Sequence, residues 1–384
     1  MKRTLPFMFY LVYFGAAVFI QPFVVVYFQE LGFSGVQIGI LVGIIPLGIM
    51  IGAPLWTGLA DAKMQHKLIM SLTILVSVAI AAIFPLVRSF ALLIPLVFIY
   101  ALFASPIISF ADSATLSMLA EKKDLYGRVR LGGTFGWGVF ALVSGLIIDK
   151  YGIRWAFWGY SAIMIFTLLI CQKFTFGQPA ERAPVLMDAR KILSDRRWGV
   201  LLSLAFLGGV AFAVINNILA PYMVDLGATK TTVGLALFIA TLSELPVLFF
   251  ANRLLKRFSA RGLFALGLFI SGLRLILYAA FNSQTGILII QLLNGLTFPM
   301  VWVAGISYAN EIAPAGMKAT AQGLLAAMVS GIGAAAGGAV GGLLLGSVHG
   351  QATFLIVGIF VLIGMVVITL LDRVESFRQA RKLV

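Results

Sequence analysis

The chain contains little of what catalysis or metal binding requires. Of its 384 residues only 11% are charged, two are histidines and one, Cys171, is a cysteine. A single cysteine forms neither an internal disulfide nor a metal site built on several thiolates. His66 and His349 lie outside the long apolar runs, and those runs contain no nucleophile–base or metal-ligand constellation. The sequence therefore predicts a protein that is not an enzyme and that holds no metal and no cofactor.

A soluble domain is absent from the sequence as well. Hydrophobic residues make up 61% of the chain and the mean hydropathy is +1.05, well outside the range of soluble domains. A helix of about 20 apolar residues crosses the roughly 30 Å hydrocarbon core of a bilayer. We therefore predict an all-α polytopic membrane protein with twelve transmembrane helices, near residues 5–29, 36–59, 67–87, 91–117, 130–148, 155–172, 199–224, 231–252, 262–281, 285–309, 319–346 and 351–371.

A sequence repeat divides the chain into halves. Residues 27–39 read YFQELGFSGVQIG, and residues 222–234 read YMVDLGATKTTVG, with a tyrosine, an acid, Leu-Gly, a hydroxyl residue and a second glycine at identical spacing. Because the two copies are offset by about half the length of the chain, the repeat indicates two structural halves rather than a solenoid of short units. We expect an N-terminal six-helix bundle at 1–172, a cytoplasmic linker at 173–198 and a C-terminal six-helix bundle at 199–384, with the functional cavity between the bundles.

The net charge of +14 is explained by membrane topology. Most lysines and arginines fall in loops and tails on one side of the predicted spans, whereas the opposite loops contain only Arg88, Lys150, Arg154 and Lys230. The positive-inside rule then predicts that both termini are cytoplasmic. We expect a multi-pass protein of the cell (inner or plasma) membrane, with the lipid bilayer and no nucleic acid as partner.

Four charged residues lie where a bilayer disfavours them: Asp112, Arg130, Glu244 and Arg274. A charge at the centre of a membrane helix costs about 2.5–3.5 kcal/mol, so such residues face a partner or a water-filled cavity. Their depths along neighbouring helices predict two acid–arginine pairs, Asp112 with Arg130 and Glu244 with Arg274. Each pair is either functional or a purely structural ion pair.

Polar and aromatic residues accompany these charges. Trp137 follows Arg130 by two helical turns and shares its face. An aromatic plane beside an arginine suits a ring-shaped polar ligand such as a sugar, a nucleoside or an aromatic acid, although a lone tryptophan equally serves packing. Hydrogen bonds between helices account for some of the uncharged polar residues, and the others are candidates to line the cavity: Gln21, Asn216, Asn217, Gln291, Asn294, Thr297 and Gln322.

Two further features concern movement. Asp61 and Lys63 lie at the cytoplasmic ends of spans 2 and 3, and Arg253 and Arg257 at those of spans 8 and 9. Such charges can latch neighbouring helices in one conformation, or they merely set the topology. Spans 5 and 11 carry glycines at close spacing, which favours tight helix packing and also suits a sliding contact.

Residues 126–137 read YGRVRLGGTFGW and follow Asp112, which stands eighteen residues before Arg130. This pattern resembles the span 4–5 signature of lactose-permease-like symporters of the major facilitator superfamily. SELP at 243–246 and GLR at 272–274 resemble the second acid–arginine pair of that family, and the whole layout looks most like its phenylpropionate permease and nucleoside–proton symporter branch. The resemblance implies the major facilitator fold, substrate binding by Asp112 and Arg130, and stacking of Trp137 on a sugar ring.

The sequence departs from that family in span 10. Where lactose-permease-like proteins carry a histidine and a glutamate before the proline, this chain has Asn294 and Thr297 before Pro299. A histidine relay within the membrane is therefore absent. If protons are coupled to transport, the carrier must be Glu244 or Asp112.

Together these features predict a monomeric, proton-coupled symporter that imports a small organic solute, such as a sugar, a nucleoside or an aromatic carboxylate, by alternating access. The alternatives are a proton-antiport exporter of amphiphilic compounds and a scaffold or sensor that transports nothing. Substrate identity, flux direction and coupling ion stay open. We expect substrate binding by Asp112, Arg130, Trp137, Asn216, Asn217, Asn294 and Thr297, and proton coupling by Glu244, Arg274 and Asp112.

Overall fold

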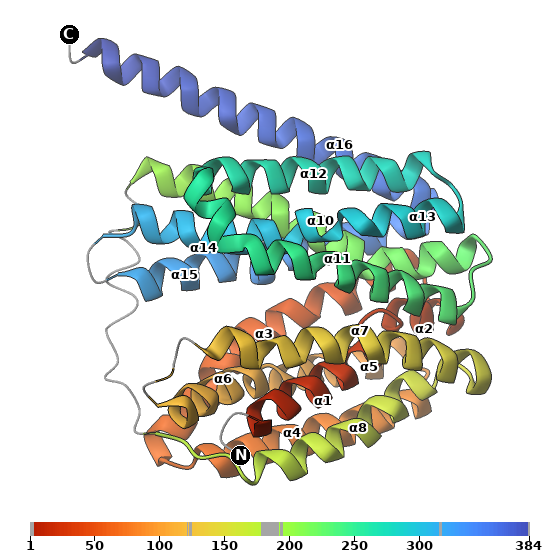
Figure 1. The fold of residues 1–384 in the computed structure, drawn as a ribbon. Helices are drawn as coiled ribbons and strands as arrows, with labels where there is room; N and C mark the ends of the chain where they lie inside the picture. Colours follow the sequence, from red (N-terminus) through yellow and green to blue (C-terminus); the bar gives the residue numbers. More distant parts are fainter. Residues whose placement is uncertain are drawn as a thin grey trace. The chain divides into compact units, whose positions relative to one another are not determined.

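A computed structural model describes residues 4–120, 122, 125–177, 192, 195–314 and 317–382, and these residues are almost entirely helical, with no strand among them (Figure 1). Helices are the expected solution for such apolar runs, because a helix satisfies its backbone hydrogen bonds within one segment and can therefore be surrounded by lipid.

The first half of the chain forms eight helices within its described residues. Helices α1 and α2 are separated by only three residues. Helix α3 begins with a capping box, in which the Ser34 and Gln37 side chains each accept a hydrogen bond from the other residue's backbone N–H. The helices are α1 (Thr4–Ile20), α2 (Val24–Glu30), α3 (Gly35–Lys63), α4 (His66–Ile83), α5 (Phe90–Ala104), α6 (Pro106–Leu119), α7 (Tyr126–Tyr151) and α8 (Trp155–Cys171).

In the second half, two regular helices are interrupted. A 3₁₀ segment, Gln291–Leu296, separates α13 from α14, and a π-helical segment, Ala327–Gly333, separates α15 from α16. His349, with φ 63° and ψ 171°, divides α16 into two helical parts. The helices are α10 (Arg196–Asp225), α11 (Lys230–Arg257), α12 (Ala260–Ala280), α13 (Gln284–Ile290), α14 (Phe298–Ile312), α15 (Lys318–Ala326) and α16 (Ala334–Lys382).

The prediction of twelve spans is confirmed. Ten helical stretches in the described residues are long and apolar enough to cross a membrane, and the last of them, Thr320–Val374, contains 55 residues. That stretch holds two spans because the backbone turns at His349. The shorter apolar helix Trp155–Cys171 supplies the remaining span.

The chain forms two compact units, one comprising Met1–Glu181 with Asn216–Thr241, and the other comprising Arg182–Ile215 with Leu242–Val384. Helices α10 and α11 each contribute to both. The expected bundle boundaries at 1–172 and 199–384 stay a prediction, and most of the expected linker at 173–198 lies outside the described residues.

Glycines allow the helices of the first unit to approach closely. Helix α1 lies between α7 and α8 (Figure 1). A Cβ atom on Gly132 or Gly136 of α7 would collide with the backbone of α1 at Phe7 or Leu11. This is the packing role expected for small residues in membrane helices. In the second unit, α12 packs against α14 and α16.

Candidate functional site

The first unit brings Asp112 of α6 and Arg130 of α7 together. Arg130 Nε lies 4.0 Å from Asp112 Oδ1, and each side chain is 34% exposed. The Tyr10 hydroxyl of α1 donates a hydrogen bond of 2.6 Å to the same carboxylate oxygen. Three helices therefore meet at one partly accessible acid–arginine pair, in agreement with the pairing expected from depth along spans 4 and 5.

The aromatic partners of Arg130 are not the one expected from the sequence. Its guanidinium lies over the rings of Tyr10 and Phe14, with Cζ 4.9 Å and 4.5 Å from the ring centroids. Both rings belong to α1, which the spacing on α7 did not indicate. Trp137 is half-buried two turns further along α7, so its stacking on a ligand stays a prediction. The arrangement holds the guanidinium plane in place by cation–π contacts.

The second unit surrounds Arg274 with neutral acceptors. Arg274 Nη1 donates to Asn294 Oδ1 at 2.6 Å and to Thr297 Oγ1 at 3.1 Å, and Nη2 donates to Gln291 Oε1. The Tyr278 hydroxyl also donates to Gln291 Oε1, at 3.1 Å. Arg274 is only 2% exposed. Arg274 Nε and Gln291 Nε2 are buried donors without a hydrogen-bond acceptor among the described residues.

Glu244 joins this network through an amide. Asn294 Nδ2 donates to Glu244 Oε1 at 2.7 Å, while Asn294 Oδ1 accepts from Arg274. Among the described residues, Glu244 and Arg274 form no direct ion pair. The direct pair that the sequence predicted is replaced by a bridge through the Asn294 side chain. Glu244 and Asn294 are half-buried, whereas Arg274 is buried.

The bridge depends on the 3₁₀ segment that carries Asn294. Ser243, the residue before Glu244, accepts a hydrogen bond from Gly295 N–H at 3.0 Å and donates one to the Gln291 carbonyl at 3.3 Å. A Cβ atom on Gly295 would collide with the Ser243 carbonyl. The glycine therefore lets the segment approach α11 closely enough for Asn294 to reach Glu244.

This close approach makes Gly295 sensitive to substitution. We expect Gly295→Ala to destabilise the protein by about 1–3 kcal/mol, the usual cost of overpacking, seen as a lower apparent Tm of the purified protein. Gly323→Ala is the matched control, because a Cβ atom there meets no other atom within 4 Å. Equal melting of the two variants would contradict the packing described.

The other predicted residues have separate surroundings. Asn216 and Asn217 are half-buried on α10, and their expected role in substrate binding, like that of Asn294 and Thr297, stays a prediction. Of these last two, Thr297 is 2% exposed and bonded to Arg274, so in this structure it supports the arginine and does not face an open space.

Three of the four predicted latch residues contact side chains that are close to them in the sequence. Asp61 lies 2.7 Å from His66 Nε2, at the start of α4, and Lys63 is exposed. In the second unit, Arg253 lies over the Phe250 ring and Arg257 over that of Phe258, at 5.3 Å and 5.7 Å from the centroids. A latching role for Asp61, Lys63, Arg253 and Arg257 stays a prediction.

One contact was not foreseen. Asp149, at the end of α7, accepts hydrogen bonds from the backbone N–H groups of Lys230 and Thr231 at 2.8 Å and 2.7 Å, and a further one from the Thr231 hydroxyl. Lys230 Nζ in turn lies 3.4 Å from Glu30 Oε1. The carboxylate thus caps the N-terminus of α11. Asp149 lies just beyond a predicted span, where an acid is ordinary, so no signal in the sequence marked it.

Comparisons with known proteins agree with this architecture. The model of the MFS_1 like family matches residues 7–356. The maltose permease of Geobacillus stearothermophilus is 27% identical over 97% of this chain and 95% of its own. The probable 3-phenylpropionic acid transporter of Escherichia coli (strain K12) is 22% identical over 78% of this chain and 80% of its own.

A solved structure shares the fold. The crystal structure of a mutant of the nucleoside transporter NupG has a TM-score of 0.87 with this chain, at 15% identity, and covers 96% of this chain and 99% of its own. The family and the structural neighbours are membrane transporters and not enzymes. This chain therefore belongs to the MFS_1 like family and is a multi-pass membrane transporter with the major facilitator fold.

Proposed function

We propose that the protein is a proton-coupled symporter that imports a small organic solute by alternating access. The observation that carries the proposal is the bridge from Glu244 through Asn294 to the buried Arg274. With Glu244 ionised, the acid and the arginine balance each other. Protonation of Glu244 leaves Arg274 with neutral acceptors alone, so the charge state of the site changes by one unit when a proton binds.

The substrate is proposed to bind at Asp112 and Arg130. This pair is partly exposed, whereas Arg274 is buried. A carboxylate and a guanidinium side by side can bind neighbouring hydroxyls of a sugar or nucleoside, and the guanidinium can bind a carboxylate. The names of the relatives, a maltose permease, a 3-phenylpropionic acid transporter and a nucleoside transporter, support the same three substrate classes.

Protons supply enough energy for uptake. One proton moving through 100 mV releases about 2.3 kcal/mol, which corresponds to roughly 50-fold accumulation of a neutral solute. The strong bias of basic residues supports cytoplasmic termini in a cell membrane.

Uptake into proteoliposomes tests the proposal. A panel of maltose, nucleosides and 3-phenylpropionate, applied with an inward proton gradient, first identifies a substrate. Glu244→Gln is then expected to lose accumulation above equilibrium while retaining exchange of substrate across the membrane, because glutamine cannot release a proton. Glu311→Gln is the matched control, since Glu311 is an exposed acid of α14.

Gradient-driven accumulation by Glu244→Gln at the wild-type level would exclude Glu244 as the coupling residue. Accumulation driven by an outward proton gradient would instead favour the exporter. Absence of flux for every solute class would favour a protein that does not transport by this route.

A further inference from the structure

The first unit contains a cavity whose lining includes none of the residues assigned to transport. Its volume is about 600 Å³, and it lies where α3 ends, α4 begins and the chain leaves α8. Its lining includes the ammonium group of Lys67, the imidazole of His66 and the uncharged polar side chains of Gln65, Ser71 and Gln172. An apolar side is formed by Met64, Leu68 and Phe176.

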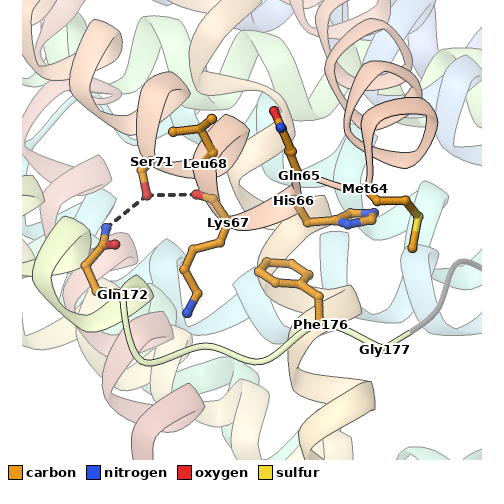
Figure 2. Close-up of a pocket in the computed structure, with 9 residues that line it drawn as sticks. All are labelled: Met64, Gln65, His66, Lys67, Leu68, Ser71, Gln172, Phe176 and Gly177. Atoms are coloured by element: carbon orange, nitrogen blue, oxygen red, sulfur yellow. Dashed lines mark hydrogen bonds between the residues drawn. The ribbon is translucent and has the colours of Figure 1, made fainter.

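Lys67 gives the cavity its charge. Figure 2 shows its side chain extending between Gln172 and Phe176. Gln172 Nε2 donates to Ser71 Oγ at 2.9 Å, which holds the amide at the wall. The nearby acid, Asp61, contacts His66 Nε2 at 2.7 Å, and the His66 ring stacks on that of Phe176 with centroids 5.3 Å apart. Lys67 therefore supplies the ammonium group to which a ligand in the cavity can bind.

The surroundings of the cavity are basic. Lys63 precedes it at the end of α3 and Lys173 follows Gln172, and both are exposed. Within the part of the chain that the structure describes, three lysines thus stand near the carboxylate of Asp61. The first N–H groups of α4 receive no side-chain cap, which adds positive partial charge at the same end. Charge complementarity favours an anion, and an oxyanion such as phosphate can accept charge-assisted hydrogen bonds from the Lys67 ammonium.

The apolar side of the cavity continues along the membrane helix. Leu68, Leu72 and Leu75 are 63%, 44% and 54% exposed, and their spacing places them on one face of α4. In a membrane transporter this face contacts acyl chains. Leu68 belongs both to the cavity and to this face. A ligand with a phosphate at one end and a hydrocarbon chain at the other fits the two together, and a small soluble anion would use only the first.

We propose that this cavity binds the headgroup of an anionic phospholipid of the leaflet that contacts the start of α4. The Lys67 ammonium contacts the phosphodiester, and an acyl chain follows Leu68, Leu72 and Leu75. Basic pockets between membrane helices are suited to such headgroups. The ligand stabilises the turn between α3 and α4 because its binding connects that turn to the segment after α8.

Binding of phosphatidylglycerol to the purified full-length protein tests this proposal, with native mass spectrometry to count bound lipids and a fluorescent phosphatidylglycerol to titrate affinity. Lys67→Gln is expected to weaken binding about fivefold, which is the effect of one basic residue at about 1 kcal/mol. Lys173→Gln is the matched control: it removes the same charge one residue from Gln172 but outside the cavity lining, and is expected to bind as the wild type does. Wild-type melting of both variants shows that they fold.

A third variant and a competitor identify the ligand class. Leu68→Gln removes the apolar wall and is expected to weaken lipid binding, while inorganic phosphate is expected not to displace the lipid. Equal weakening by Lys67→Gln and Lys173→Gln would show attraction to a charged surface and overturn the site. Displacement by inorganic phosphate, with no effect of Leu68→Gln, would assign the cavity to a soluble anion and overturn the lipid. Equal affinity for phosphatidylcholine would overturn the requirement for an anion.

Discussion

Replacing Arg130 by glutamine is expected to reduce substrate uptake, as kcat/KM, by about 100-fold. Each hydrogen bond to a charged group contributes about 1.5–3 kcal/mol, and a bidentate guanidinium makes two, which together correspond to at least that factor. The side chain is held ready for such contacts by Asp112 and by the rings of Tyr10 and Phe14. Arg130→Lys keeps the charge but loses the planar fork and much of the ring contact, so it is expected to restore little of the activity.

Arg128 provides the control for this experiment. It lies two residues earlier on the same helix and is exposed. Unlike Arg130, it contacts neither an aromatic ring nor a carboxylate among the residues that the structure describes. Arg128→Gln is expected to transport at close to the wild-type rate. Initial uptake rates over a range of substrate concentrations, normalised to the protein present in the membrane, check both variants. An equal loss in the two would assign the effect to topology or insertion and remove Arg130 from the binding site.

Sequence patterns predicted best what depends on distance along one helix. Length and hydropathy gave the twelve spans, because crossing a bilayer requires a fixed length of apolar helix. The contact of Asp112 with Arg130 followed as well, since few residues separate the end of α6 at Leu119 from the start of α7 at Tyr126, which limits the difference in depth between the two side chains. Depth predicted that Glu244 and Arg274 are neighbours, but it did not predict the 3₁₀ segment that inserts Asn294 between them.

What the sequence concealed are contacts made by residues with no unusual chemistry. Tyr10 and Phe14 are ordinary in an apolar helix, and only the packing of α1 against α7 brings them to Arg130. Gln291 was one of several polar residues, and its role in holding Arg274 depends on the rotation of the 3₁₀ segment Gln291–Leu296. Such rotations are set by side-chain packing between helices, which hydropathy does not encode.

Helices α7 and α11, which come from different halves of the sequence repeat, contact each other within the first unit. Within the first unit their backbones touch: a Cβ atom on Gly234 of α11 would collide with the Ala141 carbonyl of α7, and one on Gly145 would collide with Lys230. Asp149 closes the end of this contact by capping α11. Under alternating access, a contact between helices of opposite halves near the predicted outer surface must form and break in every cycle.

Gly234→Leu is therefore expected to abolish most uptake by preventing this contact. Overpacking costs about 1–3 kcal/mol or more, and a shift of 3 kcal/mol changes the ratio of two conformations by about 150-fold. The outward-open form is then favoured, so substrate is expected to bind from outside but to enter slowly. Gly199→Leu is the matched control, because nothing lies within 4 Å of a Cβ atom at Gly199.

A single-cysteine reporter separates this mechanism from misfolding. Cys171 is the one cysteine of the chain, so Cys171→Ser provides a background without thiols, and Thr241→Cys places a thiol at a 7% exposed position against Gly138. A membrane-impermeant maleimide applied from outside is expected to label this thiol faster in Gly234→Leu than in the parent. Asp149→Ala, which removes only the cap at about 1 kcal/mol, is expected to raise labelling by about fivefold. Unchanged labelling and uptake in Gly234→Leu would show that loss of the α7–α11 contact does not shift the balance between conformations, and the outer gate would then have to lie elsewhere in the chain.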